Sequence, residues 1–135
     1  MNYWLVKQEP ATYSFEDFQK EKKTEWTGVR NYMARNFLRD MKKGDAVLFY
    51  HSGDEKAVVG FATVAKAAFP DPTADSDAWV AVELKAGKKF KRPVPLSEIK
   101  ADERLANMLL VKNSRISVMS VTPEEYDQVV AMGNS

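Results

Sequence analysis

The sequence predicts one α+β domain, with a small sheet flanked by short helices. At 135 residues, 44% of them hydrophobic, the chain suits a single domain over residues 1–135. Residues 46–50 are continuously apolar, which is typical of a strand covered on both faces, so we expect them at the centre of the sheet. Apolar residues at i, i+3, i+4 and i+7 from Ala34 indicate a buried helical face. Gly60, inside a second apolar stretch, predicts a bulge or a bend of the barrel type.

The first elements can be assigned from local signals. Residues 3–6 are aromatic and branched and lead to Pro10, so they predict a first strand with a polar end. Ser14 followed by Asp17 forms a capping-box pattern and predicts a short helix from about residue 15 to about residue 22. The remaining predictions follow in order: a strand over 57–69, a loop over 70–77, a hairpin of strands 79–84 and 90–94 that turns at 86–88, one or two short helices within 96–111, a strand over 114–119, and a helix from the N-cap Thr122 to near residue 133.

Composition excludes several classes of function. With 20 basic and 19 acidic side chains the net charge is +1, so binding of a polyanion must depend on local patches of charge. The chain has no cysteine and one histidine, which makes a metal site improbable, and no cofactor is indicated. The sequence has neither an export signal nor a long apolar span, so we expect a cytoplasmic protein without a membrane partner.

Catalytic patterns are weak. His51 is the one available base for a serine nucleophile, and the adjacent Ser52 is expected to face the other way if it continues a strand. Paired carboxylates at 16–17 and 124–125 fall in predicted first helical turns, where the helix dipole explains them. Phosphate-binding glycine patterns of the Rossmann and P-loop kinds are missing from the sequence. These observations favour a binding protein over an enzyme.

Residues 26–31 contain the most distinctive combination of side chains. Trp26 offers an aromatic plane, Gly28 allows unusual backbone angles, and Arg30 and Asn31 offer hydrogen-bonding groups just before a helix. We interpret the segment as part of a site for a flat ligand with polar edges. The alternative is an ordinary core tryptophan beside a turn glycine.

Two basic groups could contact phosphates. One is a stripe on the predicted helix, and the other lies at the predicted hairpin tip. For both, a solvated surface without a ligand is the alternative. The residues are Arg35, Arg39 and Lys42 on the helix, and Lys88 and Lys89 at the hairpin.

Several blocks together resemble the EVE-domain proteins of the thymocyte nuclear protein family. The blocks occur in the order of that family's signature and span almost the whole chain: residues 3–7 with 9–10, 26–32, 34–36, 44–45, 49–52, 70–71 and 114–118. Gln8 departs from the pattern, because the family usually has serine after the lysine. This difference could change a hydrogen bond in the pocket and thus the preferred ligand.

The resemblance implies a PUA-like fold, a small mixed β-barrel flanked by short helices and related to YTH and ASCH domains. It also implies a reader of nucleic acid whose pocket receives a modified, flipped base, with cytosine derivatives in DNA the class associated with EVE domains. Trp26 would be the aromatic wall. The pocket residues carried over are Lys7, Gln8, Trp26, Arg30, Asn31, His51, Ser52 and Arg115.

Two rival functions remain at this point. The first is an RNA reader of the YTH kind, for which 2′-hydroxyl contacts would matter. The second is an enzyme acting on a small nucleotide or nucleoside, which would show turnover. The leading hypothesis is a non-catalytic module that binds DNA carrying a modified cytosine.

Overall fold

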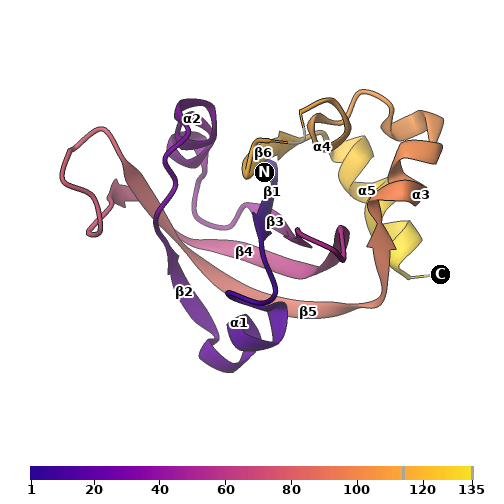
Figure 1. Ribbon diagram of the computed structural model, residues 1–135, viewed down its shortest axis with the longest axis horizontal. Helices are drawn as coiled ribbons and strands as arrows, with labels where there is room; N and C mark the ends of the chain where they lie inside the picture. Colours follow the sequence, from indigo (N-terminus) through magenta and orange to yellow (C-terminus); the bar gives the residue numbers. More distant parts are fainter. Residues whose placement is uncertain (114, 135) are drawn as a thin grey trace.

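The computed structural model describes residues 1–113 and 115–134, and its strands form one six-stranded sheet (Figure 1). The strands are β1 (Tyr3–Gln8), β2 (Lys23–Trp26), β3 (Ala46–His51), β4 (Ala57–Pro70), β5 (Val80–Pro95) and β6 (Val118–Val121). Their order across the sheet is β2-β5-β4-β3-β1-β6. All six residues of β3 are buried, which confirms the predicted central strand.

The sheet is mixed. β1 pairs with β3 in parallel, Tyr3 opposite Ala46 and Gln8 opposite His51, whereas β6 runs antiparallel to β1 on its other side. Parallel neighbours need a long crossover connection. Here the crossover comprises α1 (Phe15–Glu21), β2 and α2 (Tyr32–Asp40), which carry the segment around Trp26.

The predicted helices are present, and their caps explain where they begin. Ser14 and Asp17 make the expected capping box at α1, and Thr122 and Glu125 make another at the start of the last helix. Asn31 caps α2, because its Oδ1 accepts a hydrogen bond from the Ala34 N–H at 3.0 Å. The other helices are α3 (Leu96–Ala101), the 3₁₀ turn η1 (Glu103–Leu105), α4 (Leu109–Lys112) and α5 (Pro123–Gly133). No helix in the described part of the chain is both long enough and apolar enough to cross a membrane.

The predicted hairpin at residues 86–88 is wrong, because β5 is one continuous strand. β4 pairs with it on both sides of Gly87, through Ala62 with Ala86 and through Gly60 with Lys89. Between these two pairs the chain advances two residues along β4 but three along β5. Gly87 therefore lies at a bulge. A Cβ at Gly87 would lie 2.9 Å from the carbonyl oxygen of Phe61. Close approach of the neighbouring backbone, rather than a turn, therefore explains the glycine at this position.

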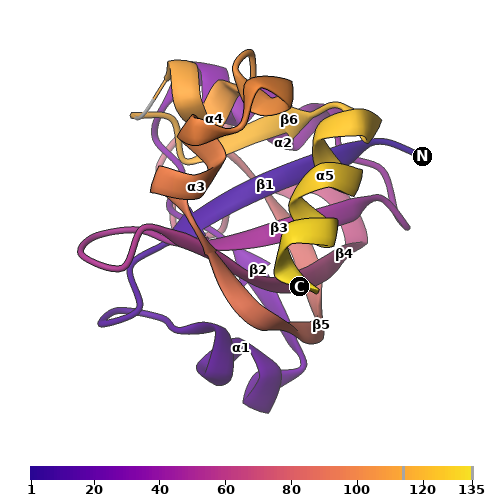
Figure 2. The ribbon, with the colours of Figure 1, turned by 90° about the vertical axis from the view of Figure 1, so that its right-hand side faces the viewer.

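The bulge or bend predicted at Gly60 of β4 is confirmed. At Gly60 the register with both neighbouring strands shifts, and a Cβ would lie 2.3 Å from the ring of Phe15. Figure 2 shows the long strands bending around the interior. The curvature brings aromatic rings from α1, β2 and β3 into one cluster around Phe49, whose ring centre lies 5.2 Å from Phe15, 5.4 Å from Phe18 and 5.7 Å from Trp26.

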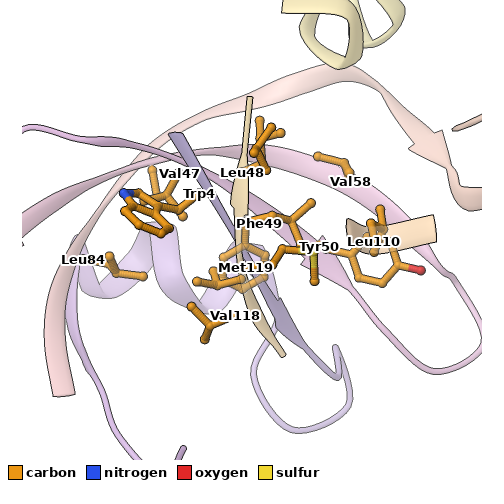
Figure 3. Packing of buried hydrophobic residues seen from close by; sticks show 14 of the residues in the cluster. Trp4, Val47, Leu48, Phe49, Tyr50, Val58, Leu84, Leu110, Val118 and Met119 are labelled. Carbon is orange, nitrogen blue, oxygen red and sulfur yellow. The ribbon is translucent and has the colours of Figure 1, made fainter. Parts of the chain in front are cut away.

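The same core includes side chains from β1, β6 and α4. Trp4, Val118, Met119 and Leu110 belong to one buried cluster with the β3 side chains, and Figure 3 labels them together. Two differences from the sequence-based assignment concern short strands. β2 was not predicted, and the strand expected over 114–119 is β6, which begins at Val118; Ser114 lies outside the described residues.

Candidate functional site

A cavity of about 130 Å³ lies where the end of β1 meets the end of β2. Gln8 belongs to β1 and Trp26 to β2, and three strands separate β1 from β2 in the hydrogen-bonded order. They can share a cavity because the sheet curls on itself. The lining residues are Gln8, Tyr13, Thr24, Glu25, Trp26 and Thr27.

Trp26 serves the core and the cavity at once. Only 6% of its surface is exposed, and its ring meets Phe49 edge to face at an interplanar angle of 87°. It pairs with Val82 at the end of β2, so the segment begins as an edge strand rather than as a flexible loop. The chain leaves this strand through Gly28, whose φ of 82° is strained for other residues and matches the expected role of glycine.

Tyr13 lines the cavity and was not singled out from the sequence. Its hydroxyl donates a hydrogen bond to a carboxylate oxygen of Glu21. Burial, together with the hydrogen bond and charge of Glu21, raises the pKa of Tyr13 to about 12. With its proton committed to Glu21 and one lone pair accepting from the Thr24 side chain, the phenol oxygen keeps one lone pair for a donor in the cavity. The sequence signal for Tyr13 was its position directly before the N-cap Ser14, where side chains often pack onto the helix.

Gln8 supplies a hydrogen-bond donor to the cavity. Its Oε1 accepts from the backbone N–H of Glu9 at 3.2 Å, which fixes the orientation of the amide. The NH₂ group can therefore donate to a ligand. Cavity residues thus combine an aromatic wall with at least one donor and one acceptor.

Arg30 fastens the loop after β4 beside this region. Its Nη1 donates to Asp71 Oδ2 at 3.0 Å, and its Nη2 donates to Thr73 Oγ1 at 3.2 Å. Asp71 is buried and also accepts from the backbone N–H of Gly28 at 2.9 Å. Burial alone would raise the pKa of Asp71, but the hydrogen bonds from Thr73, Gly28 and Arg30 outweigh it and hold that pKa well below its usual range. Arg30 thus acts as a brace for the loop.

His51 is built into the fold. Its Nε2 accepts from the backbone N–H of Phe15 at 3.0 Å, so that nitrogen carries no proton, and Nδ1 lies 2.9 Å from Glu55 Oε1. Both ring nitrogens therefore have partners from the chain. The adjacent Ser52 is half-buried, and its backbone N–H donates to Gln8 O at 3.0 Å.

Lys7 and Arg115 are not among the residues that line this cavity. Lys7 Nζ is 5.6 Å from the centre of the Tyr50 ring, and partial burial lowers the pKa of Lys7. Arg115 is exposed, and its backbone N–H donates to Asn113 Oδ1. Of the eight predicted pocket residues, the structure brings Gln8 and Trp26 into one cavity. Asn31, His51 and Arg30 hold nearby segments in place.

The predicted phosphate contacts separate into two groups. Arg39 and Lys42 are exposed at and just beyond the end of α2, whereas Arg35 is half-buried and donates through Nη1 to Ala78 O at 3.0 Å. Lys88 and Lys89 are exposed on the middle of β5, and Lys89 Nζ lies 3.9 Å from Glu16. Among residues 1–113 and 115–134, no group of three or more histidine and acidic side chains could hold a metal ion.

Strand order, bent central strands and flanking helices define an α+β domain of the PUA-like class. The chain belongs to the EVE-domain family, whose model matches residues 2–132. The resemblance drawn from the sequence motifs and the predicted fold class are therefore confirmed.

Relatives and solved structures align along nearly the whole chain. Human thymocyte nuclear protein 1 is 34% identical to it over 97% of this chain and 73% of that protein. The crystal structure of Atu2648 from Agrobacterium tumefaciens is 46% identical, with a TM-score of 0.94 over 98% of this chain and 93% of that one. A crystal structure of human THYN1 in complex with 5-methylcytosine-containing DNA is 32% identical, with a TM-score of 0.93 over 100% of this chain and 99% of that one.

Proposed function

We propose that this chain is a non-catalytic module that binds DNA and receives a modified, flipped base, a cytosine derivative, in the cavity between β1 and β2. The observation that carries the proposal is the similarity, over the full length of this chain, to human THYN1 in complex with 5-methylcytosine-containing DNA. The chemistry of the cavity agrees with this choice of ligand.

A base in the cavity would find complementary groups. Cytosine carries an exocyclic amine that donates and a ring edge that accepts. The Tyr13 oxygen can accept from the amine, and the Gln8 amide can donate to the ring edge. Trp26 supplies the inner aromatic wall. Because only 6% of Trp26 is exposed, polar contacts from the rim must contribute much of the base affinity.

The energetics require contacts outside the cavity as well. Extruding a base from a duplex costs a few kcal/mol, and stacking on an aromatic side chain returns about 1–3 kcal/mol. Phosphate contacts from the exposed basic residues would supply the remainder. We assign this role to Arg35, Arg39, Lys42, Lys88 and Lys89.

The decisive experiment is a comparison of binding to matched nucleic acids. Fluorescence anisotropy with short duplexes that carry one cytosine or one 5-methylcytosine at the same position should give tighter binding to the modified duplex, by about tenfold for one added methyl group. Gln8→Ala should reduce that preference, while Gln128→Ala, a half-buried glutamine of α5 whose amide bonds Asp102, serves as the matched control.

Each rival function gives a different outcome. Equal affinity for the two duplexes would contradict base reading. Tighter binding to an RNA strand of the same sequence would favour the RNA reader, because its 2′-hydroxyls would then be in contact. A modified nucleotide whose mass changes on incubation with the protein would indicate an enzyme.

A further inference from the structure

Two aromatic rings outside the cavity, one exposed and one half-buried, form a pair. Tyr32 opens α2 and Trp79 precedes β5, and their ring centres lie 4.9 Å apart at an interplanar angle of 30°. Tyr32 is 62% exposed, and Trp79 is half-buried. An exposed ring that packs against a second ring leaves aromatic surface available to a ligand.

Two guanidinium groups accompany the rings. The guanidinium carbon of Arg35 lies 4.8 Å from the centre of the Tyr32 ring, and that of Arg30 lies 5.6 Å from the centre of the Trp79 ring. The Arg30 charge is balanced by Asp71 at 3.0 Å. The hydrogen bonds described for Arg35 go to the neutral acceptors Ala78 O and Asn36 Oδ1, so its positive charge is available to an anion.

The Tyr32–Trp79 pair is not required to hold the loop over residues 71–79 in place. That loop is already held by the Asp71 carboxylate, which accepts from Gly28, Arg30 and Thr73. The Arg35 bond to Ala78 O holds its far end. Fastening the loop therefore does not require a tyrosine at position 32, and does not explain why so much of that ring faces solvent. The anchoring instead makes the pair rigid, which favours binding because less freedom is lost.

We propose that Tyr32 and Trp79 form a stacking platform for one unpaired nucleobase beside the base held in the cavity. Aromatic rings accompanied by arginine are the combination that binds single-stranded nucleic acid without reading its sequence, because every base has a π face. The platform begins six residues after Trp26, and Arg30 and Gly28 link its loop to the chain that leaves β2. The inference rests on the proposed function for the nucleic-acid partner and adds a second contact.

Stacking, rather than bulk charge, must dominate at this platform. The same loop carries the exposed carboxylates Asp75 and Asp77, which oppose the attraction of phosphates by Arg35. Removing the Tyr32 ring should therefore change affinity with little change in the salt dependence of binding.

The test uses single strands with 5-methylcytosine or cytosine at the centre, each made with either normal flanking nucleotides or abasic ones. The wild-type protein should bind the strand with flanking bases at least about fivefold more tightly than the abasic strand, the lower end of what stacking provides. Tyr32→Ala and Tyr32→Leu should both abolish this difference, and Tyr32→Phe should keep it. Met33→Ala is the matched control, since Met33 is exposed on the same helical turn.

The outcomes separate this inference from the proposed function. If the wild-type protein shows no preference for 5-methylcytosine but its preference for flanking bases depends on the Tyr32 ring, the proposed function fails and the platform stands. If Tyr32→Ala or Tyr32→Leu keeps the difference between normal and abasic strands, the platform is wrong, whatever the preference for the central base.

Discussion

The Nε2 atom of His51 accepts the backbone N–H of Phe15 across 3.0 Å and so joins the end of β3 to the first turn of α1. This contact spans 36 residues of sequence. It satisfies one of the N–H groups that a helix leaves unpaired at its start. Because Phe15 packs against Phe49 and against the space kept open by Gly60, the bond also positions the aromatic core beside β2.

Replacing His51 should therefore mainly lower the stability of the fold. His51→Ala should lower the free energy of unfolding by about 1–3 kcal/mol, because a buried N–H loses its acceptor. His51→Gln places an acceptor near the position of Nε2 and should recover part of the loss. Urea unfolding measures both, with Ser52→Ala as the neighbouring control. A His51→Ala protein as stable as wild type would contradict the structural role.

Trp26 is expected to behave as a core residue and as a cavity wall. Trp26→Ala should cost about 3–5 kcal/mol of stability, similar to Trp4→Ala, because the two rings are 6% and 4% exposed. Trp26→Phe should be milder and keep an aromatic wall. Thermal unfolding and anisotropy on folded samples should give a Trp26→Phe protein that prefers modified DNA and a Trp26→Leu protein that binds both duplexes equally. A Trp26→Leu variant that keeps the preference would leave Trp26 as a core residue alone.

Asp71 should make stability depend on acid pH. Its folded-state pKa is held well below the ordinary aspartate value of about 4, so its contribution is fully present above the unfolded-state pKa and is lost as pH falls below it toward the folded-state value. Urea midpoints should therefore decrease between about pH 5 and about pH 3, and Asp71→Asn should flatten that decrease. Asp75→Asn, an exposed carboxylate on the same loop, is the control. Equal slopes for Asp71→Asn and wild type would exclude this origin.

The lysines of β5 test the phosphate assignment. If two to four of the five assigned basic residues contact phosphates at once, the slope of log affinity against log salt should be about −2 to −4 for a duplex, and Lys88→Gln with Lys89→Gln should reduce its magnitude by about 2. Affinity for modified and unmodified DNA should fall alike, because phosphate contacts carry little sequence information. Lys100→Gln, an exposed lysine of α3, is the control. A double variant that lost only the preference for modified DNA would move the reading site to β5.

Local sequence signals predicted most of the elements. The spacing from Ala34 fixed the buried face of α2, capping residues marked the starts of α1 and α5, and the apolar run at 46–50 identified β3. Each of these signals acts within one or two turns or along one strand, so it can be read without knowing the partners. The family motifs likewise pointed to the correct fold class.

Long-range pairing decided what the sequence could not. Residues 84–90 look like a hairpin locally, yet β4 pairs along both halves of β5 and keeps it extended through Gly87. β2 is a strand because β5 offers it an edge, with Lys23 opposite Lys85 and Trp26 opposite Val82.

The candidate site likewise depends on both local sequence and long-range structure. The residue types around Trp26 and Gln8 indicated a polar, aromatic pocket, but nothing in the sequence says that three strands would curl to bring them together. Nor does it say that His51 and Asn31 would be engaged at helix starts, that Tyr13 would line the cavity, or that Tyr32 would pack against Trp79. Sequence determined which chemical groups are available, while tertiary structure decided which remain open to a ligand, because hydrogen bonds within the fold are satisfied by whichever groups the folded chain brings near.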